Sequence, residues 1–140
     1  MTLEEYLEGK KWIRRDIQRK KAKIRFFQEK AVNVTARYSD TSGCSETRNV
    51  HSMEDAVLDV NELEAQIRSD LEKLRELDAA FLRELKGMDN PMLAMVLELK
   101  YVYDGSWREV AQSTQYSVRQ LHRLQKEAAA YLREKNTGNP

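Results

Sequence analysis

The chain has 140 residues, of which 34% are charged and 41% hydrophobic, with only 5 Gly and 2 Pro. So few turn-forming residues argue against a β-sandwich or barrel, which needs a turn roughly every ten residues. Abundant Leu, Glu, Lys, Arg and Ala favour long helices instead. A single cysteine, Cys44, excludes an internal disulfide, and with two histidines it leaves too few ligands for a structural zinc site. We therefore expect an all-α protein. No phosphate loop, histidine–carboxylate metal pattern or paired-carboxylate arrangement stands out from the background of charge, so we expect no enzyme and no cofactor or metal.

The hydropathy pattern also gives an expectation for location. No apolar run approaches the ~18 residues that a membrane-spanning helix needs. The N-terminal residues 1–5 are acidic and lack the apolar segment of a signal peptide. Both features predict a cytoplasmic protein.

Residues 3–38 are predicted to form one long helix. Apolar side chains recur there with heptad spacing, interrupted at Lys10 and Lys20, which predicts a helix of roughly 50 Å. The segment is basic, because residues 1–38 hold 11 Lys and Arg against 5 Asp and Glu. The apolar positions are Leu3, Tyr6, Ile13, Ile17, Ile24, Phe27, Ala31, Val34 and Tyr38.

A second long helix is predicted over residues 53–88. It follows a polar loop near 39–52 that contains Gly43, and Ser52 with Asp55 could cap it. Residues 53–86 are acidic, with 5 Lys and Arg against 10 Asp and Glu. Two long helices of opposite charge joined by a loop predict an antiparallel αα-hairpin, or coiled coil, over residues 1–88. Its second apolar seam is Met53, Val57, Val60, Ile67, Leu71, Leu74, Phe81, Leu85 and Met88, with Leu63 and Leu77 beside it.

Residues 89–140 are predicted to form a separate domain of three helices. Gly87 ends the second long helix, and Asn90-Pro91 starts a helix that continues to about Tyr103. Two capping boxes follow, Ser106-x-x-Glu109 and Ser117-x-x-Gln120. They predict a short helix over 107–113, a tight turn at 114–116 and a last helix over 118–135.

A short helix, a tight turn and a longer basic helix are typical of the helix-turn-helix motif. The motif needs small or branched apolar residues where its two helices cross. The residues expected in that crossing are Val110, Ala111, Tyr116, Leu121 and Leu124. If Leu121, Leu124, Ala128, Tyr131 and Leu132 are buried, the opposite face of the last helix presents Arg119, Gln120, His122, Arg123 and Lys126.

From Asn90 onward the chain resembles region four of bacterial primary sigma factors, the region that recognises promoters. Residues 96–101, Val-Leu-Glu-Leu-Lys-Tyr, resemble the V-L-x-L-R-Y segment of the family's preceding helix. Residues 106–111, Ser-Trp-Arg-Glu-Val-Ala, resemble its S/T-x-x-E-V/I-A/G motif, and Ser117 matches the Ser or Thr that starts the recognition helix. The long hairpin is similar to that of small sigma-like transcription regulators from phages and prophages of Gram-positive bacteria.

The sequence departs from region four at the positions that read DNA. The resemblance implies base contacts from Val118, Arg119, His122 and Arg123, where the family pattern is Arg, Glu, Arg and Gln. The familiar promoter sequence is therefore not expected to carry over. Gln115 also stands where many helix-turn-helix proteins have a left-handed Gly, which predicts strain of ~1 kcal/mol. The chain has no room for the sigma regions that melt promoters, so we do not expect a complete sigma factor.

These observations predict a sequence-specific transcriptional regulator of phage or prophage type, nucleoid-associated in a bacterial host. Its partners would be double-stranded DNA and either a second copy, as a homodimer, or bacterial RNA polymerase. Arg and Gln can read base edges, whereas Lys and a helix N-terminus bind phosphate. The predicted base contacts are Val118, Arg119, Gln120, His122 and Arg123. The predicted phosphate contacts are Ser106, Arg108, Ser117 and Lys126.

Two other functions fit the same pattern. A small terminase subunit, which packages phage DNA, also combines a helix-turn-helix with a coiled coil. A coiled-coil adaptor could instead bind RNA polymerase through the sigma-like end without touching DNA. The basic residues between Lys10 and Arg25 are interpreted as a helix face matched to the acidic second helix rather than as a DNA contact.

Overall fold

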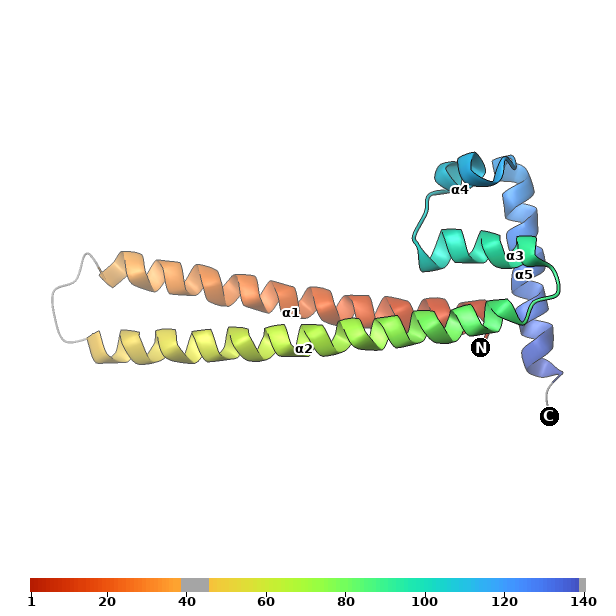
Figure 1. The fold of residues 1–140 in the computed structure, drawn as a ribbon. Coiled ribbons are helices and arrows are strands. Elements are labelled where there is room, and N and C mark those ends of the chain that lie inside the picture. Colours follow the sequence, from red (N-terminus) through yellow and green to blue (C-terminus); the bar gives the residue numbers. More distant parts are fainter. Residues whose placement is uncertain (39–45, 139–140) are drawn as a thin grey trace. The chain divides into compact units, whose positions relative to one another are not determined.

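The computed structural model describes residues 1–38 and 46–138, with side chains described outside 33–38 and 46–53. Within these residues every regular element is helical, which confirms the expected all-α class (Figure 1). The elements are α1 (Leu3–Tyr38), α2 (Glu46–Lys86), α3 (Pro91–Leu97), the π-helical η1 (Glu98–Val102), α4 (Trp107–Thr114) and α5 (Val118–Thr137).

The chain forms two compact units. One comprises Met1–Lys11 together with Leu74–Pro140, and the other is Trp12–Lys73. The start of α1 and the end of α2 thus belong to the same unit as the C-terminal helices. The predicted division into a hairpin domain, residues 1–88, and a helix-turn-helix domain, residues 89–140, stays a prediction.

In the unit Trp12–Lys73, α1 and α2 run antiparallel (Figure 1). Ile17 and Leu63 are buried, and Lys20 donates a hydrogen bond to the buried carboxylate of Asp70. Because a charged pair occupies part of the seam, Lys20 is a seam residue rather than an interruption. The predicted seam of α2 is wrong at Val57 and Leu71, which are 57% and 42% exposed.

The predicted start of α2 is also wrong. Residues 46–52 were expected in the loop, but α2 begins at Glu46, so Ser52 lies inside the helix and is not its cap. The physical reason is that residues 46–52 contain neither Gly nor Pro, so nothing there interrupts helical hydrogen bonding. The remaining part of the predicted loop, residues 39–45, lies outside the described residues.

The other unit has one main hydrophobic core, shared by the start of α1, the end of α2, α3 and α5. At its centre the rings of Tyr6 and Phe81 are stacked, with centroids 4.0 Å apart and planes 3° from parallel. Leu97, Ala128 and Leu132 pack into the same cluster and are fully buried. Burial of this aromatic pair anchors the first turns of α1 beside the C-terminal helices.

The segment between α2 and α4 differs in part from its prediction. Asn90 caps α3 as expected, because its side chain accepts a 3.0 Å hydrogen bond from the Met92 N–H, and Pro91 follows at the first helical position. The predicted helix to about Tyr103 is confirmed in extent as far as Val102, but after Leu97 it widens from an α-helix into the π-helical η1. The Tyr103 N–H bonds the Glu98 carbonyl five residues back, at 3.1 Å.

Gly105 closes this widened turn. Its N–H donates a 2.9 Å hydrogen bond to the carbonyl of Leu99. A Cβ at position 105 would lie 2.9 Å from that same carbonyl oxygen, so the close approach requires glycine. This contact sets the start of α4.

Candidate nucleic-acid interface

Two serines fix the N-termini of α4 and α5. Ser106 Oγ accepts a 3.1 Å hydrogen bond from the Glu109 N–H, and Ser117 Oγ accepts one of 3.2 Å from the Gln120 N–H. At α5 the box is reciprocal, because Gln120 Oε1 accepts a 3.0 Å hydrogen bond from the Ser117 N–H. Both predicted N-caps are confirmed.

The turn between α4 and α5 contains a left-handed residue. Gln115 has φ 67°, and its N–H donates a 2.9 Å hydrogen bond to the Ala111 carbonyl. The Thr114 hydroxyl donates to the Val110 carbonyl at 2.7 Å. A non-glycine residue in this conformation costs roughly 1 kcal/mol, so the predicted strain at Gln115 has a geometric basis.

The residues predicted to meet where α4 and α5 cross do lie in one cluster. Val110 and Leu121 are buried, and they pack against Val96 from α3. Ala111, Tyr116 and Leu124 are partly buried around them. This packing directs the opposite face of α5 towards solvent. Farther along α5, Ala128 and Leu132 are buried and Tyr131 is partly buried, as expected.

The predicted contact residues all lie on the solvent-facing side of α4 and α5. Positions 118, 119, 122, 123 and 126 share one face of a helix because they are spaced by about one turn. Val118 is 41% exposed and so places an apolar side chain on this face. The exposed set comprises Ser106, Arg108, Ser117, Val118, Arg119, Gln120, His122, Arg123 and Lys126.

The cations on this face are not held in ion pairs, although Glu109 and Glu127 are exposed beside them. Among the described residues, no ion pair involves Arg108, Arg119, Arg123 or Lys126. The first turn of α5 contains no acidic residue, so the partial positive charge of its N-terminus is not offset there. The face therefore suits a phosphate backbone electrostatically.

Trp107 of α4 and His122 on the exposed face of α5 contact each other. Their ring centroids lie 4.5 Å apart, with planes tilted by 48°. The Lys100 ammonium lies 5.1 Å from the Trp107 ring centroid and donates a 3.1 Å hydrogen bond to the Gly105 carbonyl. Lys100, which the sequence marked only as part of the segment 96–101, thus links η1 to the start of α4.

Two predicted contact residues also have a structural role. The Ser117 hydroxyl and the Gln120 carboxamide oxygen are both engaged in the α5 cap. Because the cap uses only the oxygen of Gln120, its amide N–H groups can still donate to a base edge. The Gln120 carboxamide therefore has only hydrogen-bond donors left to offer.

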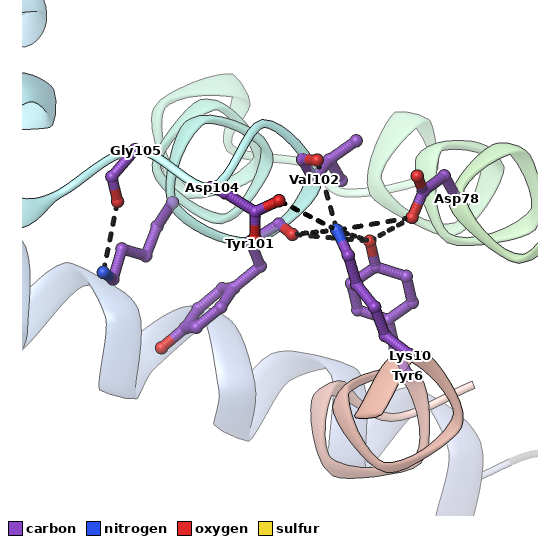
Figure 2. Close-up of polar contacts among 8 residues, drawn as sticks. Tyr6, Lys10, Asp78, Tyr101, Val102, Asp104 and Gly105 are labelled. Atoms are coloured by element: carbon purple, nitrogen blue, oxygen red, sulfur yellow. Dashed lines mark hydrogen bonds and ion pairs between the residues drawn. The ribbon is translucent and has the colours of Figure 1, made fainter. Parts of the chain in front are cut away.

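Sequence reasoning missed the polar cluster that supports this region, shown in Figure 2. The buried Lys10 ammonium donates hydrogen bonds to the carbonyls of Tyr101 at 2.6 Å and Val102 at 3.2 Å. It also donates to the Tyr6 hydroxyl at 3.2 Å and lies 3.6 Å from an Asp78 carboxylate oxygen. The Tyr6 hydroxyl donates to Asp78. The signal in the sequence that could have indicated this cluster was Lys10 itself, a charged residue at a seam position where the pattern expects an apolar one.

Tyr101 is the residue of this region whose acidity is clearly altered. Burial disfavours the phenolate and raises the pKa of Tyr101 above its ordinary value of 10.0, and a hydrogen bond with Gln125 of α5 partly opposes this. The neutral phenol therefore contributes to the packing of η1 against α5.

Other kinds of site find no support in the described part of the chain. No group of three His, Cys, Asp or Glu side chains there could hold a metal ion. No helix among the described residues has the length and apolar character to span a bilayer. Comparison with known protein families, curated proteins and solved structures finds no match to this chain.

Proposed function

We propose that this protein is a sequence-specific DNA-binding transcriptional regulator of phage or prophage type. In this proposal α4, the turn and α5 act as a helix-turn-helix similar to sigma region four, with α5 in the major groove. Arg119, Gln120 and Arg123 read base edges, with Val118 and His122 beside them. Ser106, Arg108, Ser117 and Lys126 hold the phosphates on either side.

One observation carries the proposal. The packing of Val110 and Leu121 against Val96 exposes one face of α5 whose cations have no acidic partner among the described residues. A helix face that served only solubility would be expected to mix both signs of charge. Here the first two turns of α5 carry Arg119 and Arg123 and no acid.

The test is selection from a random pool of DNA duplexes, followed by sequencing, at two salt concentrations. Wild-type protein should enrich one motif, and the double variant Arg119→Ala/Arg123→Ala should lose that enrichment. The matched control is Arg133→Ala/Lys135→Ala, which removes the same charge from exposed positions farther along α5. The control should enrich the wild-type motif.

Two outcomes would contradict the proposal. Equal weak binding to all sequences with a steep salt dependence would favour DNA packaging, as in a small terminase subunit. No binding at either salt, together with binding to bacterial RNA polymerase, would favour an adaptor that does not touch DNA.

A further inference from the structure

Two large aromatic side chains lie exposed on one face of α1. Trp12 is 52% exposed and Phe26 is 61% exposed. They are 14 residues apart, which is four helical turns, so they lie on the same face of the helix. Burying an aromatic side chain of this kind removes about 150–250 Å² from water, so leaving both exposed is unfavourable.

The same face of α1 is basic. Arg15, Arg19, Lys23 and Lys30 fall between and beside the two aromatic residues at spacings of three, four and seven, and all four are exposed. Arg19 is paired with Asp16 of the same helix. The Arg15 guanidinium lies 5.9 Å from the Trp12 ring centroid, which places a cation directly at the aromatic surface. This stripe, residues 12, 15, 19, 23, 26 and 30, is called the α1 stripe.

An exposed stripe of α2 has the opposite character. Asp55, Leu58, Asp59, Glu62, Ala65 and Ser69 recur at helical spacing, and all are exposed. It carries three acids and no base, together with Leu58, which is 64% exposed, and the small residues Ala65 and Ser69. Over the described side chains of this unit, residues 12–32 hold 8 Lys and Arg against 2 acids, whereas residues 54–73 hold 2 against 7.

The two stripes lie on the same side of the antiparallel pair. Buried contacts between Tyr6 and Phe81 and between Lys20 and Asp70 set the register of the two helices in their respective units. In that register Lys23 and Lys30 flank the seam of α1 on the side where Asp59 flanks the seam of α2. One side of the hairpin thus presents a basic half with two aromatic rings and an acidic half.

We infer that this side of the hairpin binds a second copy of the chain. Two copies can stack face to face by a two-fold rotation about an axis parallel to the helices or one perpendicular to them. The parallel axis sets α1 of each copy over α2 of its partner. In the register set by Tyr6 and Phe81, this places Lys23 near Glu62 and Lys30 near Asp59 of the partner, and it covers Phe26. The perpendicular axis sets α1 over α1 and α2 over α2, which opposes like charges. Charge therefore selects the four-helix bundle in which α1 of each copy faces α2 of the other.

The test measures the mass of the full chain in solution by light scattering over a wide concentration range. Wild type should be a dimer. Lys23→Glu/Lys30→Glu should be monomeric, and so should Asp59→Lys/Glu62→Lys, because each places like charges across both copies of the interface. The matched control is Lys21→Glu/Arg25→Glu, which reverses two charges of α1 on the other side of the hairpin and should remain dimeric.

Mixing the two monomeric variants gives the decisive result. In a mixed pair both interfaces regain opposite charges, so an equimolar mixture should form a heterodimer. Charge pairs within each chain stay broken in the mixture, so rescue reports contact between chains alone. Circular dichroism of each variant checks that the helices remain formed.

Three results would overturn the inference. The first is a wild-type protein that is monomeric at every concentration. This result would overturn the inference even if the α1 stripe then proved to bind nucleic acid in a salt-dependent way. A dimer unaffected by either pair of reversals would place the interface elsewhere. Helical monomeric variants that fail to associate on mixing would show that the two stripes do not face each other.

Discussion

The Lys10 ammonium donates a 2.6 Å hydrogen bond to the carbonyl oxygen of Tyr101, 91 residues away in the sequence. Tyr101 and Val102 end η1, where carbonyls lack partners within the helix. A residue of α1 therefore supplies the hydrogen bonds that the end of η1 needs. This dependence makes the start of α1 part of the support for the helices that carry the candidate interface.

Replacing Lys10 by Met should destabilise the protein. The substitution removes a buried donor from two carbonyls, and leaving a buried polar group unsatisfied costs about 1–3 kcal/mol. The measurement is the free energy of unfolding by chemical denaturation. Lys11→Met is the matched control, because Lys11 is the exposed neighbour and its loss should change stability little. Equal effects of the two substitutions would contradict a role for the Lys10 cluster.

Replacing Gln115 by Gly should stabilise the turn between α4 and α5. Gln115 has φ 67°, a conformation that costs a non-glycine residue roughly 1 kcal/mol and that glycine adopts freely. Part of this gain is offset by the greater freedom of glycine in the unfolded chain. Gln112→Gly, inside α4, should instead lower the unfolding free energy by about 1 kcal/mol. A loss of stability in Gln115→Gly would show that the glutamine side chain itself stabilises the turn.

Stability should depend on Tyr101 at alkaline pH. Burial raises the pKa of Tyr101 in the folded state, so the neutral phenol stabilises the fold below its unfolded pKa of about 10. This contribution is lost as the pH rises through the folded pKa. Tyr101→Phe cannot ionise, so its unfolding free energy should fall less steeply above pH ~10 than that of wild type. Parallel curves for the two proteins would contradict this assignment.

Arg123 and Lys126 should contribute differently to DNA binding. Arg123→Ala should relax sequence preference at one position and cost roughly 1–3 kcal/mol on the preferred site. Lys126→Ala should weaken all sequences alike and reduce the slope of log affinity against log salt by about one. The measurement is a titration of the selected duplex and a scrambled one at several salt concentrations, with the exposed Lys86→Ala as control. Identical behaviour of the two variants would mean that the assigned roles are wrong.

The sequence by itself determined those structural features that depend on interactions between residues close together in the chain. Caps at Asn90, Ser106 and Ser117 depend on a side chain bonding a backbone N–H two or three residues away, so their spacing predicts them. Helical periodicity likewise predicted the crossing cluster around Val110 and Leu121. The exposed face of α5 follows from the same periodicity, because burying one side of a helix exposes the other.

Tertiary structure decided the features that depend on distant partners. Lys10 and Lys20 interrupt an apolar pattern in sequence, yet both fill the seam, because Tyr101, Val102 and Asp70 supply acceptors there. Asp70, paired with Lys20, is buried, whereas its neighbour Leu71, which the heptad pattern expected to be buried, is 42% exposed. The end of η1 likewise depends on α1, because Lys10 of α1 donates a hydrogen bond to the carbonyl of Tyr101 in η1. A buried charge is stable only where other groups form hydrogen bonds or ion pairs with it. Heptad spacing cannot predict these groups when they lie far away in the sequence.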